Sequence, residues 1–484
     1  MLEPFWAGPR RGETTMVQTS EEQGLNAMLA VRPTPRQLAW QQLGMYAFLH
    51  FGMSTMTDRE WGLGHEDPTL FDPDDLDADE WMKALAGAGM RGVILTAKHH
   101  DGFCLWPSRL TSHTVASSSW RGGRGDLVAE VADAARRAGL RFGVYLSPWD
   151  RTEPSYGSGT GYDDFYVGQL TELLTGYGEI FEVWLDGANG EGENGRRQLY
   201  DWDRYYQVVR ELQPGAVIAV CGPDVRWCGN EAGHTRADEW SVVPGSLRDA
   251  ERIASRSQTV DDGDFARRVT SDEEDLGSRA ALAGHLDHLV WYPSEVNTSI
   301  RPGWFHHPSE DDRVRDADEL FSLYRGSVGG NASFLLNVPP DRHGRIGAPD
   351  REALAGLGER IASFQARTVR GRASASSGAV TPGEGVLWRA DASDLRPTLT
   401  LDLGAPTWIE AVEIGEAIAE GQRIERVVVT GRRGGETIDL GETGCVGNRR
   451  ILDVEPAKVD AVEFTVTGMR GAPLIADAAV ITAL

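Results

Sequence analysis

Short apolar runs alternate with segments of helical period along the chain from residue 36 to residue 364. Continuous apolar runs are typical of strands that are buried on both faces of a parallel sheet. The alternation therefore predicts repeated βα units. The expected strands are 44–52, 92–99, 141–147, 182–186, 216–221, 239–243, 288–293 and 333–338, and the expected helices between them are 79–88, 126–138, 163–175, 202–212, 312–328 and 349–366.

Eight strands over this length fit a single (β/α)8 TIM-like barrel with insertions, which we place at residues 34–367. The sixth strand, 239–243, has the weakest pattern. A doubly wound open sheet is the alternative, but no Gly-rich dinucleotide fingerprint follows the first strand. Residues 1–33 are expected to form a loosely ordered leader.

The pattern changes near residue 368. Residues 368–385 are small, polar and interrupted by Gly and Pro, which predicts a linker. From 386 to 484 the helical period disappears and short segments alternate between apolar and polar positions, which predicts an all-β sandwich. Such a domain can bind a glycan or brace the barrel, and the lack of an exposed aromatic cluster in its sequence favours bracing.

Charge and cysteine content narrow the class of protein. The chain has 48 Lys and Arg against 73 Asp and Glu, a net charge of −25, which disfavours nucleic acid and anionic membranes as partners. Its four cysteines form neither a disulfide framework nor a CxxC zinc pattern. No apolar run has the length of a membrane span or of a signal peptide, so a cytoplasmic location is expected. An export signal outside this sequence would change that expectation.

The stretch from Phe181 to Asp186 reads as a buried strand that ends in a carboxylate and opens into a Gly-rich loop. In a β/α barrel, side chains at the carboxyl ends of the strands form the active site. Asp186 is therefore a candidate catalytic residue. The alternative is that Asp186 caps a following helix.

Imidazole, carboxylate and aromatic side chains recur at the other expected strand ends. Aromatic rings stack on the apolar face of a sugar, and His, Asn and carboxylate groups bind its hydroxyls, so the pattern indicates a sugar site. The residues concerned are His50, Glu60, Trp61, His99, His100, Tyr145, Trp184, Trp227, Glu231, Glu295 and Trp304.

Glycoside hydrolysis needs one ionised and one protonated carboxyl group. Asp186 suits the nucleophile because it ends a rigid strand, and Glu231, in a Gly-flanked loop, suits the acid/base. Spacing along the sequence does not give the distance between them, and so does not predict the stereochemistry. A metal hydrolase using His50, His99 and Asp186 stays open as an alternative, although the adjacent His99 and His100 should point to opposite faces. We expect no metal and no cofactor.

Five motifs in this order carry a resemblance to a known family: His50-Phe51-Gly52, Glu60-Trp61, Lys98 to Phe103 (KHHDGF), Tyr145 to Trp149 (YLSPW) and Trp184 to Gly187 (WLDG). Together they resemble the α-L-fucosidases of glycoside hydrolase family 29, over residues 35–365. The resemblance implies that Asp186 is the nucleophile of a retaining double displacement. It also implies a fucose pocket made of His50, Glu60, Trp61, His99, His100, Tyr145 and Trp184.

The segment 226–233 (RWCGNEAG) is similar to the one that holds the acid/base in the subgroup selective for α-1,3/1,4-linked fucose, which implies that role for Glu231. Segments 293–305 and 336–340 resemble the same subgroup, and Glu295 is the second candidate for the acid/base. Cys228 departs from the pattern, where a larger aliphatic residue is expected. The sequence thus predicts a retaining exo-α-L-fucosidase for Lewis-type fucosylated oligosaccharides. Two alternatives stay open: a glycan-binding protein that has lost the chemistry, and a metal-dependent barrel hydrolase.

Overall fold

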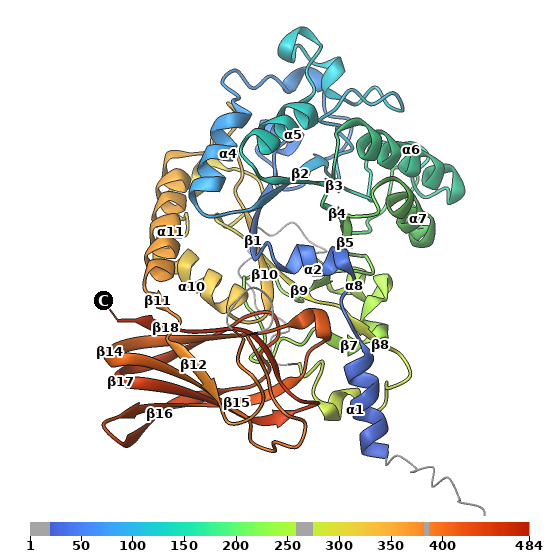
Figure 1. The fold of residues 1–484 in the computed structure, drawn as a ribbon. Coiled ribbons are helices and arrows are strands. Elements are labelled where there is room, and N and C mark those ends of the chain that lie inside the picture. Colours follow the sequence, from blue (N-terminus) through green and yellow to red (C-terminus); the bar gives the residue numbers. More distant parts are fainter. Residues whose placement is uncertain (1–19, 258–273, 382–386, 484) are drawn as a thin grey trace, which may run out of the picture.

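Eight parallel strands form the predicted barrel, in a computed structural model that describes residues 20–257, 274–381 and 387–483 (Figure 1). Their spatial order is β5-β4-β3-β2-β1-β10-β9-β6, and a bridge between Ala219 and Val225 nearly closes the ring. The strands are β1 (Met45–Leu49), β2 (Gly92–Lys98), β3 (Arg141–Leu146), β4 (Glu182–Leu185), β5 (Val217–Val220), β6 (Arg226–Trp227), β9 (Ser294–Ser299) and β10 (Ala332–Asn337).

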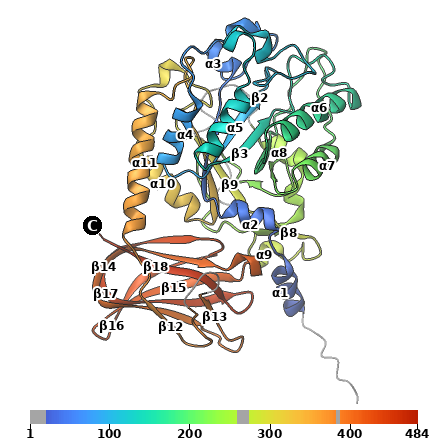
Figure 2. The same cartoon turned by 45° about the horizontal axis from the view of Figure 1, so that its top comes forward.

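Helices cover the outside of this sheet, as the periodicity predicts (Figure 2). Most begin at an Asp whose carboxylate accepts from a backbone N–H of the first turn, as Asp77, Asp126 and Asp316 do. The covering helices are α4 (Ala78–Gly87), α5 (Leu127–Arg137), α6 (Thr160–Gly176), α7 (Trp202–Leu212), α10 (Ala317–Val328) and α11 (Ala348–Ala366). Shorter helices are α2 (Pro35–Gln41), α3 (Met53–Thr57), α8 (Ala250–Arg256) and α9 (Arg279–Leu282).

Two of the eight expected strands do not enter the barrel. The segments predicted at 239–243 and 288–293 contribute β7 (Val242–Pro244) and β8 (Leu289–Trp291), which pair antiparallel in a separate two-stranded sheet. Their places in the barrel are taken by β6 and β9. The hydrophobic pattern misses β6 because it is two residues long, and β9 because its sequence, SEVNTS, is polar although every residue is buried.

Antiparallel strands form the predicted β domain below the barrel (Figure 1). They are β11 (Thr368–Val369), β12 (Arg372–Ala375), β13 (Trp388–Arg389), β14 (Thr398–Glu416), β15 (Ile424–Arg433), β16 (Glu436–Thr443), β17 (Arg450–Met469) and β18 (Leu474–Thr482). The alternating pattern predicts separate strands at 398–403, 408–414, 450–454 and 459–466, whereas β14 joins the first two and β17 the last two, with shifts of register between them. The segment predicted as a linker, 368–385, already contains β11 and β12, so the β domain starts where α11 ends.

The described part of the predicted leader is also folded. Helix α1 (Ser20–Ala30) brings Met28 into an apolar cluster with Trp291 of β8 and Ile418 of the β domain. This cluster explains why residues 20–30 form a helix rather than a loose segment. The rest of the predicted leader, residues 1–19, lies outside the described residues.

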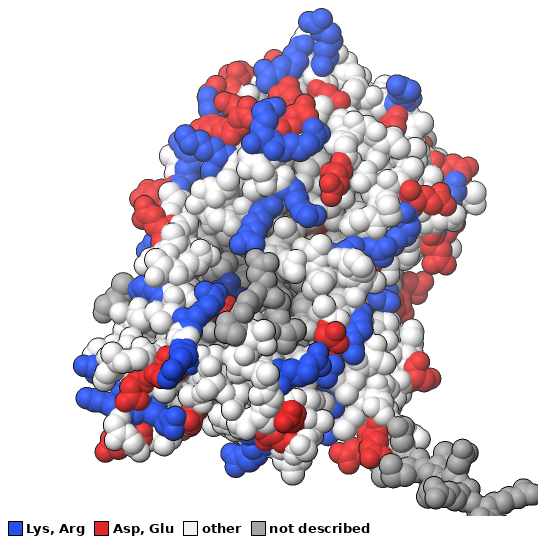
Figure 3. All heavy atoms as spheres, viewed as in Figure 1, with Lys and Arg blue, Asp and Glu red and all other residues white. Residues whose placement is uncertain are grey.

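The β domain contacts the barrel at the amino end of β10, where Gly330 bridges to Arg450. Nearby, the Cys445 N–H donates to Asp238 (2.7 Å) and the Ser241 N–H donates to Gln422 (3.0 Å). These contacts support bracing as the domain's role. Basic and acidic side chains are interspersed on the face that Figure 3 shows. In the described ranges, no helix combines the length and apolar character of a membrane span.

Candidate active site

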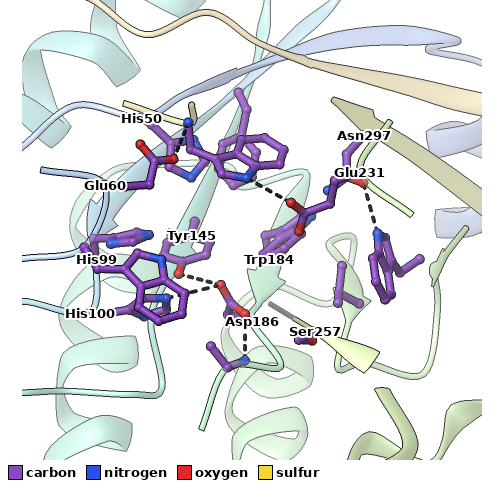
Figure 4. Close-up of a pocket in the computed structure, with 16 residues that line it drawn as sticks. His50, Glu60, His99, His100, Tyr145, Trp184, Asp186, Glu231, Ser257 and Asn297 are labelled. Atoms are coloured by element: carbon purple, nitrogen blue, oxygen red, sulfur yellow. Dashed lines mark hydrogen bonds and ion pairs between the residues drawn. The ribbon is translucent and has the colours of Figure 1, made fainter. Parts of the chain in front are cut away.

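A cavity of about 620 Å³, including its open mouth, lies at the carboxyl ends of the barrel strands (Figure 4). Eleven of the twelve predicted site residues line it: His50, Glu60, Trp61, His99, His100, Tyr145, Trp184, Asp186, Trp227, Glu231 and Trp304. The structure therefore brings together residues that span most of the barrel sequence. Their assigned roles stay predictions.

Asp186 directly follows β4 and faces the cavity (Figure 4). The Tyr145 hydroxyl donates to its Oδ2 (2.8 Å), and the Ala188 N–H donates to its Oδ1 (2.8 Å). The two donors fix the carboxylate, while 19% of the side chain stays exposed. Helix capping is excluded, because the next helix, α7, is capped by Asp201.

Glu231 lies across the cavity in the loop after β6, and its Oε2 accepts from the Trp304 indole N–H (2.9 Å). Burial raises the pKa of Glu231 to about 8. The indole hydrogen bond opposes this rise, while the negative charges of Asp186 and Glu60 add to it. A carboxyl group with this pKa is mostly protonated at pH 7, so Glu231 can donate a proton.

The tautomer of His50 follows from its hydrogen-bond network. The Asn337 amide N–H₂ donates to Ser299 Oγ (2.9 Å) and to the Trp304 carbonyl (2.7 Å), so its oxygen faces His50 and accepts from Nδ1–H (2.9 Å). Burial lowers the pKa of His50 to about 3. His50 is therefore neutral, and its Nε2 is an acceptor.

The same reasoning applies to His100. The Ser147 hydroxyl donates to the Trp149 carbonyl (2.7 Å), so it accepts from His100 Nδ1–H (2.7 Å). Burial lowers the pKa of His100 to about 4, although Asp186, 4.0 Å from its Nε2, opposes the shift. Burial also holds the pKa of His99 well below its usual range. Neutral imidazoles can bind the hydroxyl groups of a sugar without introducing charge.

Glu60 lines the cavity, but its carboxylate is already occupied by the loop that follows β9. It accepts from the backbone N–H groups of Trp304 and of Phe305 (3.2 Å), and His307 Nε2 lies 3.0 Å from it. Hydrogen bonds to Glu60 and Asp58 raise the pKa of His307 to about 9, so His307 is an imidazolium at pH 7. Glu60 thus holds the loop that carries Trp304, and sequence reasoning missed His307.

Aromatic rings form much of the cavity wall. Trp184 packs against Phe48 (5.3 Å between ring centroids) and Tyr145 (5.4 Å), and Trp61 packs edge-on against His100 (5.7 Å). Trp227 is fixed by its indole N–H, which donates to Asn297 (3.0 Å). This mixture of ring faces and neutral acceptors suits a pyranose.

Five lining residues were not predicted: Phe48, Ala188, Val220, Ser257 and Asn297. Phe48 could have been found, because it lies two positions before His50 on an inward-facing register. Asn297 belongs to β9, whose polar sequence gave no strand signal.

Glu295 is the predicted substrate-binding residue that does not line the cavity. The sequence places it in a loop after a strand, whereas it is the second residue of β9. In the sheet Glu295 pairs with Ser333 of β10, and the next residue of β10, Phe334, pairs with Met45, the first residue of β1. Glu295 is thus one residue nearer the amino ends of the strands than Met45. Glu295 therefore lies in the lower barrel interior, beneath the cavity, and this corrects its predicted role.

Metal ligation was weighed for His50, His99 and Asp186. Across residues 20–257, 274–381 and 387–483, no group of three or more His, Cys, Asp or Glu side chains is arranged to hold a metal ion. The His50 Nδ1 and both Asp186 oxygens have protein partners instead.

Comparisons with known proteins agree with this geometry. The sequence profile of the "Alpha-L-fucosidase" family matches residues 65–364. "Alpha-L-fucosidase 1" of Arabidopsis thaliana is 40% identical over 439 residues, which cover 87% of this chain and 81% of the plant protein.

Solved structures give the same result. The crystal structure of a candidate alpha-L-fucosidase from Bacteroides ovatus has a TM-score of 0.84 at 41% identity, covering 97% of this chain and 77% of that one. A glycoside hydrolase family 29 fucosidase of Ruminococcus gnavus, in complex with fucose, has a TM-score of 0.77 at 28% identity, covering 94% and 95%.

Proposed function

The chain belongs to the alpha-L-fucosidase family of glycoside hydrolases, and we propose that it is a retaining exo-enzyme that releases terminal α-1,3- or α-1,4-linked L-fucose from Lewis-type oligosaccharides. The single observation that carries the mechanism is the contrast between its two carboxyl groups. Asp186 is held by two donors, and Glu231 is partly buried, with a pKa raised to about 8.

The reaction proceeds in two displacements. Asp186 attacks the anomeric carbon and forms a glycosyl ester, while the bond to the leaving oxygen breaks and that oxygen takes the proton of Glu231. Glu231, now a carboxylate, removes a proton from water, and the water oxygen attacks the anomeric carbon. The ester bond breaks, which releases fucose and restores both carboxyl groups.

Fucose is bound by the neutral side chains around Asp186. His50, His99 and His100 supply acceptors and donors for hydroxyl groups, and the Trp184 ring supplies an apolar face. Burial keeps the three imidazoles neutral, so none of them carries a positive charge that would oppose the one developing on the sugar ring beside Asp186.

The linkage preference rests on the loops around Glu231. Trp227 and Trp304 flank the acid/base, and both loops resemble those of the α-1,3/1,4-selective subgroup. The leaving sugar must pass Glu231 to take its proton, so these two rings are the surfaces that a branched neighbouring sugar would meet.

Nuclear magnetic resonance tests the stereochemistry. Hydrolysis of an aryl α-L-fucoside and of a Lewis-type trisaccharide is followed from the first turnover. Retention predicts α-L-fucose as the first product, with the β anomer appearing only by mutarotation. β-L-Fucose as the first product would overturn the double displacement, and trisaccharide left intact while the aryl fucoside is hydrolysed would overturn the linkage preference.

Azide separates the two carboxyl roles. In Glu231→Ala, azide should attack the glycosyl ester and give α-L-fucosyl azide; in Asp186→Ala, it should replace the nucleophile and give the β azide. The opposite products would exchange the two assignments. No azide product from either variant would favour a glycan-binding protein. The cytoplasmic location stays a prediction, which fractionation of producing cells tests.

A further inference from the structure

Two buried carboxyl groups lie beneath the cavity, and the proposed mechanism does not use them. Glu182 of β4 and Glu295 of β9 are both 0% exposed. Their strands are not neighbours in the sheet, so the two side chains meet across the barrel interior, where the nearby charge of Glu295 adds to the rise that burial causes in the pKa of Glu182. Two donors link them: the Trp40 indole N–H lies 2.9 Å from Glu182 Oε2 and 3.1 Å from the Tyr46 hydroxyl, which donates to Glu295. Among the described residues, neither forms an ion pair with Lys, Arg or His.

Two carboxylates cannot both stay ionised in such a dry site, so the pair holds a proton. The neighbouring donors show where. Glu295 accepts at both oxygens, from the Trp184 indole N–H at Oε1 (2.9 Å) and from the Tyr46 hydroxyl at Oε2. Glu182 accepts from the Trp40 indole N–H at Oε2 (2.9 Å), but within the described part of the chain its Oε1 accepts from no N–H or O–H group. The negative charge therefore belongs on Glu295 and the proton on Glu182.

We infer that Glu295 is a positioning residue of the active site: its carboxylate, hydrogen-bonded by a protonated Glu182, fixes the indole of Trp184 in the cavity wall. The Trp184 ring packs on Tyr145 (5.4 Å between centroids), and the Tyr145 hydroxyl donates to Asp186 (2.8 Å). Glu295 thus acts on Asp186 through two intervening residues, Trp184 and Tyr145. The inference needs only the fucosidase activity of the family, not the proposed stereochemistry or linkage.

Glu295→Gln tests the positioning role, with Glu182→Gln as its matched control. An amide has one acceptor oxygen where the Glu295 carboxylate offers two, so in the Glu295→Gln variant Trp184 and Tyr46 can no longer both donate to separate oxygens of this side chain. We expect its kcat/KM on an aryl α-L-fucoside to fall about tenfold or more. In Glu182→Gln the new amide donates an N–H as the acid donates its O–H, so kcat/KM should stay within about threefold of wild type.

Trp184→Phe distinguishes positioning from a general structural effect. It removes the indole N–H through which Glu295 acts, so adding Glu295→Gln in this background should cost little further activity. An undiminished tenfold loss in the double variant would show that Glu295 does not act through Trp184. Wild-type activity of Trp184→Phe alone would also overturn the role, and this readout does not depend on whether Glu295→Gln folds.

Infrared spectroscopy in D₂O at neutral pH tests the proton assignment. Burial raises the pKa of Glu231 to about 8 and those of Asp101 and Glu416 to about 7, so these groups also contribute carbonyl bands of protonated carboxyl groups. They cancel in the difference spectrum between wild type and Glu182→Gln, in which we expect the band of the protonated Glu182 to remain. A difference spectrum without this band, or a Glu182→Gln enzyme as impaired as Glu295→Gln, would overturn the assignment.

Discussion

The two walls of the cavity are built differently. The wall on β4 presents Asp186 directly from the end of a fully buried strand, with donors from β3 and from its own loop. The opposite wall presents Glu231 from a loop after the two-residue strand β6, supported by Trp304 from the loop after β9. A strand end gives the proposed nucleophile a fixed position, and partial burial in a loop gives the proposed acid/base a raised pKa. One cavity therefore combines a carboxyl group that two hydrogen bonds fix in place with a second carboxyl group whose pKa is raised.

Removing the β4 carboxylate should have the largest effect. Asp186→Asn keeps the shape but cannot form the glycosyl ester, so we expect kcat to fall on the order of 10⁴-fold for every fucoside tested. Asp163→Asn is the matched control, because Asp163 is also buried and bonded to a tyrosine hydroxyl but lies on α6, outside the cavity. Comparable losses in both variants would attribute the effect to folding.

The loss of kcat on removing the Glu231 carboxyl group should depend on the leaving group of the substrate. Glu231→Gln should lower kcat about 10²- to 10⁴-fold for the trisaccharide, whose leaving alcohol needs a proton, and much less in the first step for an activated aryl fucoside. Asp186→Asn should show no such dependence. Steady-state and burst kinetics on both substrates measure it, and equal losses on the two would contradict a proton-donor role.

The dependence of kcat/KM on pH should also be set by Glu231. Because the pKa of Glu231 is raised to about 8, its acid form, and with it kcat/KM, should be lost as pH rises through about 8. The Trp304 indole N–H favours the charged form, so Trp304→Phe should move this alkaline limb to higher pH. A limb that stays in place would mean that another group controls it.

The raised pKa of Glu231 should also make the free energy of unfolding depend on pH. Between the ordinary pKa of Glu and about 8, the unfolded state loses this proton while the folded state keeps it, so folding becomes less favourable as pH rises. Glu231→Gln removes that dependence and should raise Tm by about 2–4 °C at pH 7, but not at pH 4. Thermal melts at the two pH values decide this, and a lower Tm at pH 7 would contradict it.

The loop that carries Trp304 should give the smallest effect. The pKa of His307 is raised to about 9, mainly by its hydrogen bond to Glu60. The stabilisation that the imidazolium gives to this loop is therefore complete below the ordinary pKa of His and is lost as pH rises through about 9. His307→Gln keeps one hydrogen bond without the charge, and we expect a few-fold lower kcat/KM at pH 7, with no difference from wild type at pH 10. The ratio of the two enzymes across pH measures this.

The same contrast explains what the sequence could predict. The β4 wall was predictable because an apolar run ends abruptly in Asp186 and the motifs around it are specific. The opposite side was harder, since β9 is polar in sequence and buried only because its side chains meet Tyr46, Trp184 and Trp227 inside the barrel.

Without the register of β9, Glu295 looked like a loop carboxylate at the cavity mouth, and Asn297 was not found. Helix α1 and strands β11 and β12 were missed for a related reason, because they are stabilised by contacts with distant segments rather than by local pattern. Long-range burial of polar residues is the part of this fold that periodicity does not show.

Trapping of the glycosyl ester tests the central claim most directly. A 2-deoxy-2-fluoro fucosyl fluoride slows both steps but keeps a good leaving group, so the ester should accumulate and can be located by mass spectrometry of the digested protein. We predict one adduct, on the peptide that contains Asp186, absent from Asp186→Asn. An adduct on Glu231, or turnover of the natural glycan with no adduct under any condition, would contradict the account.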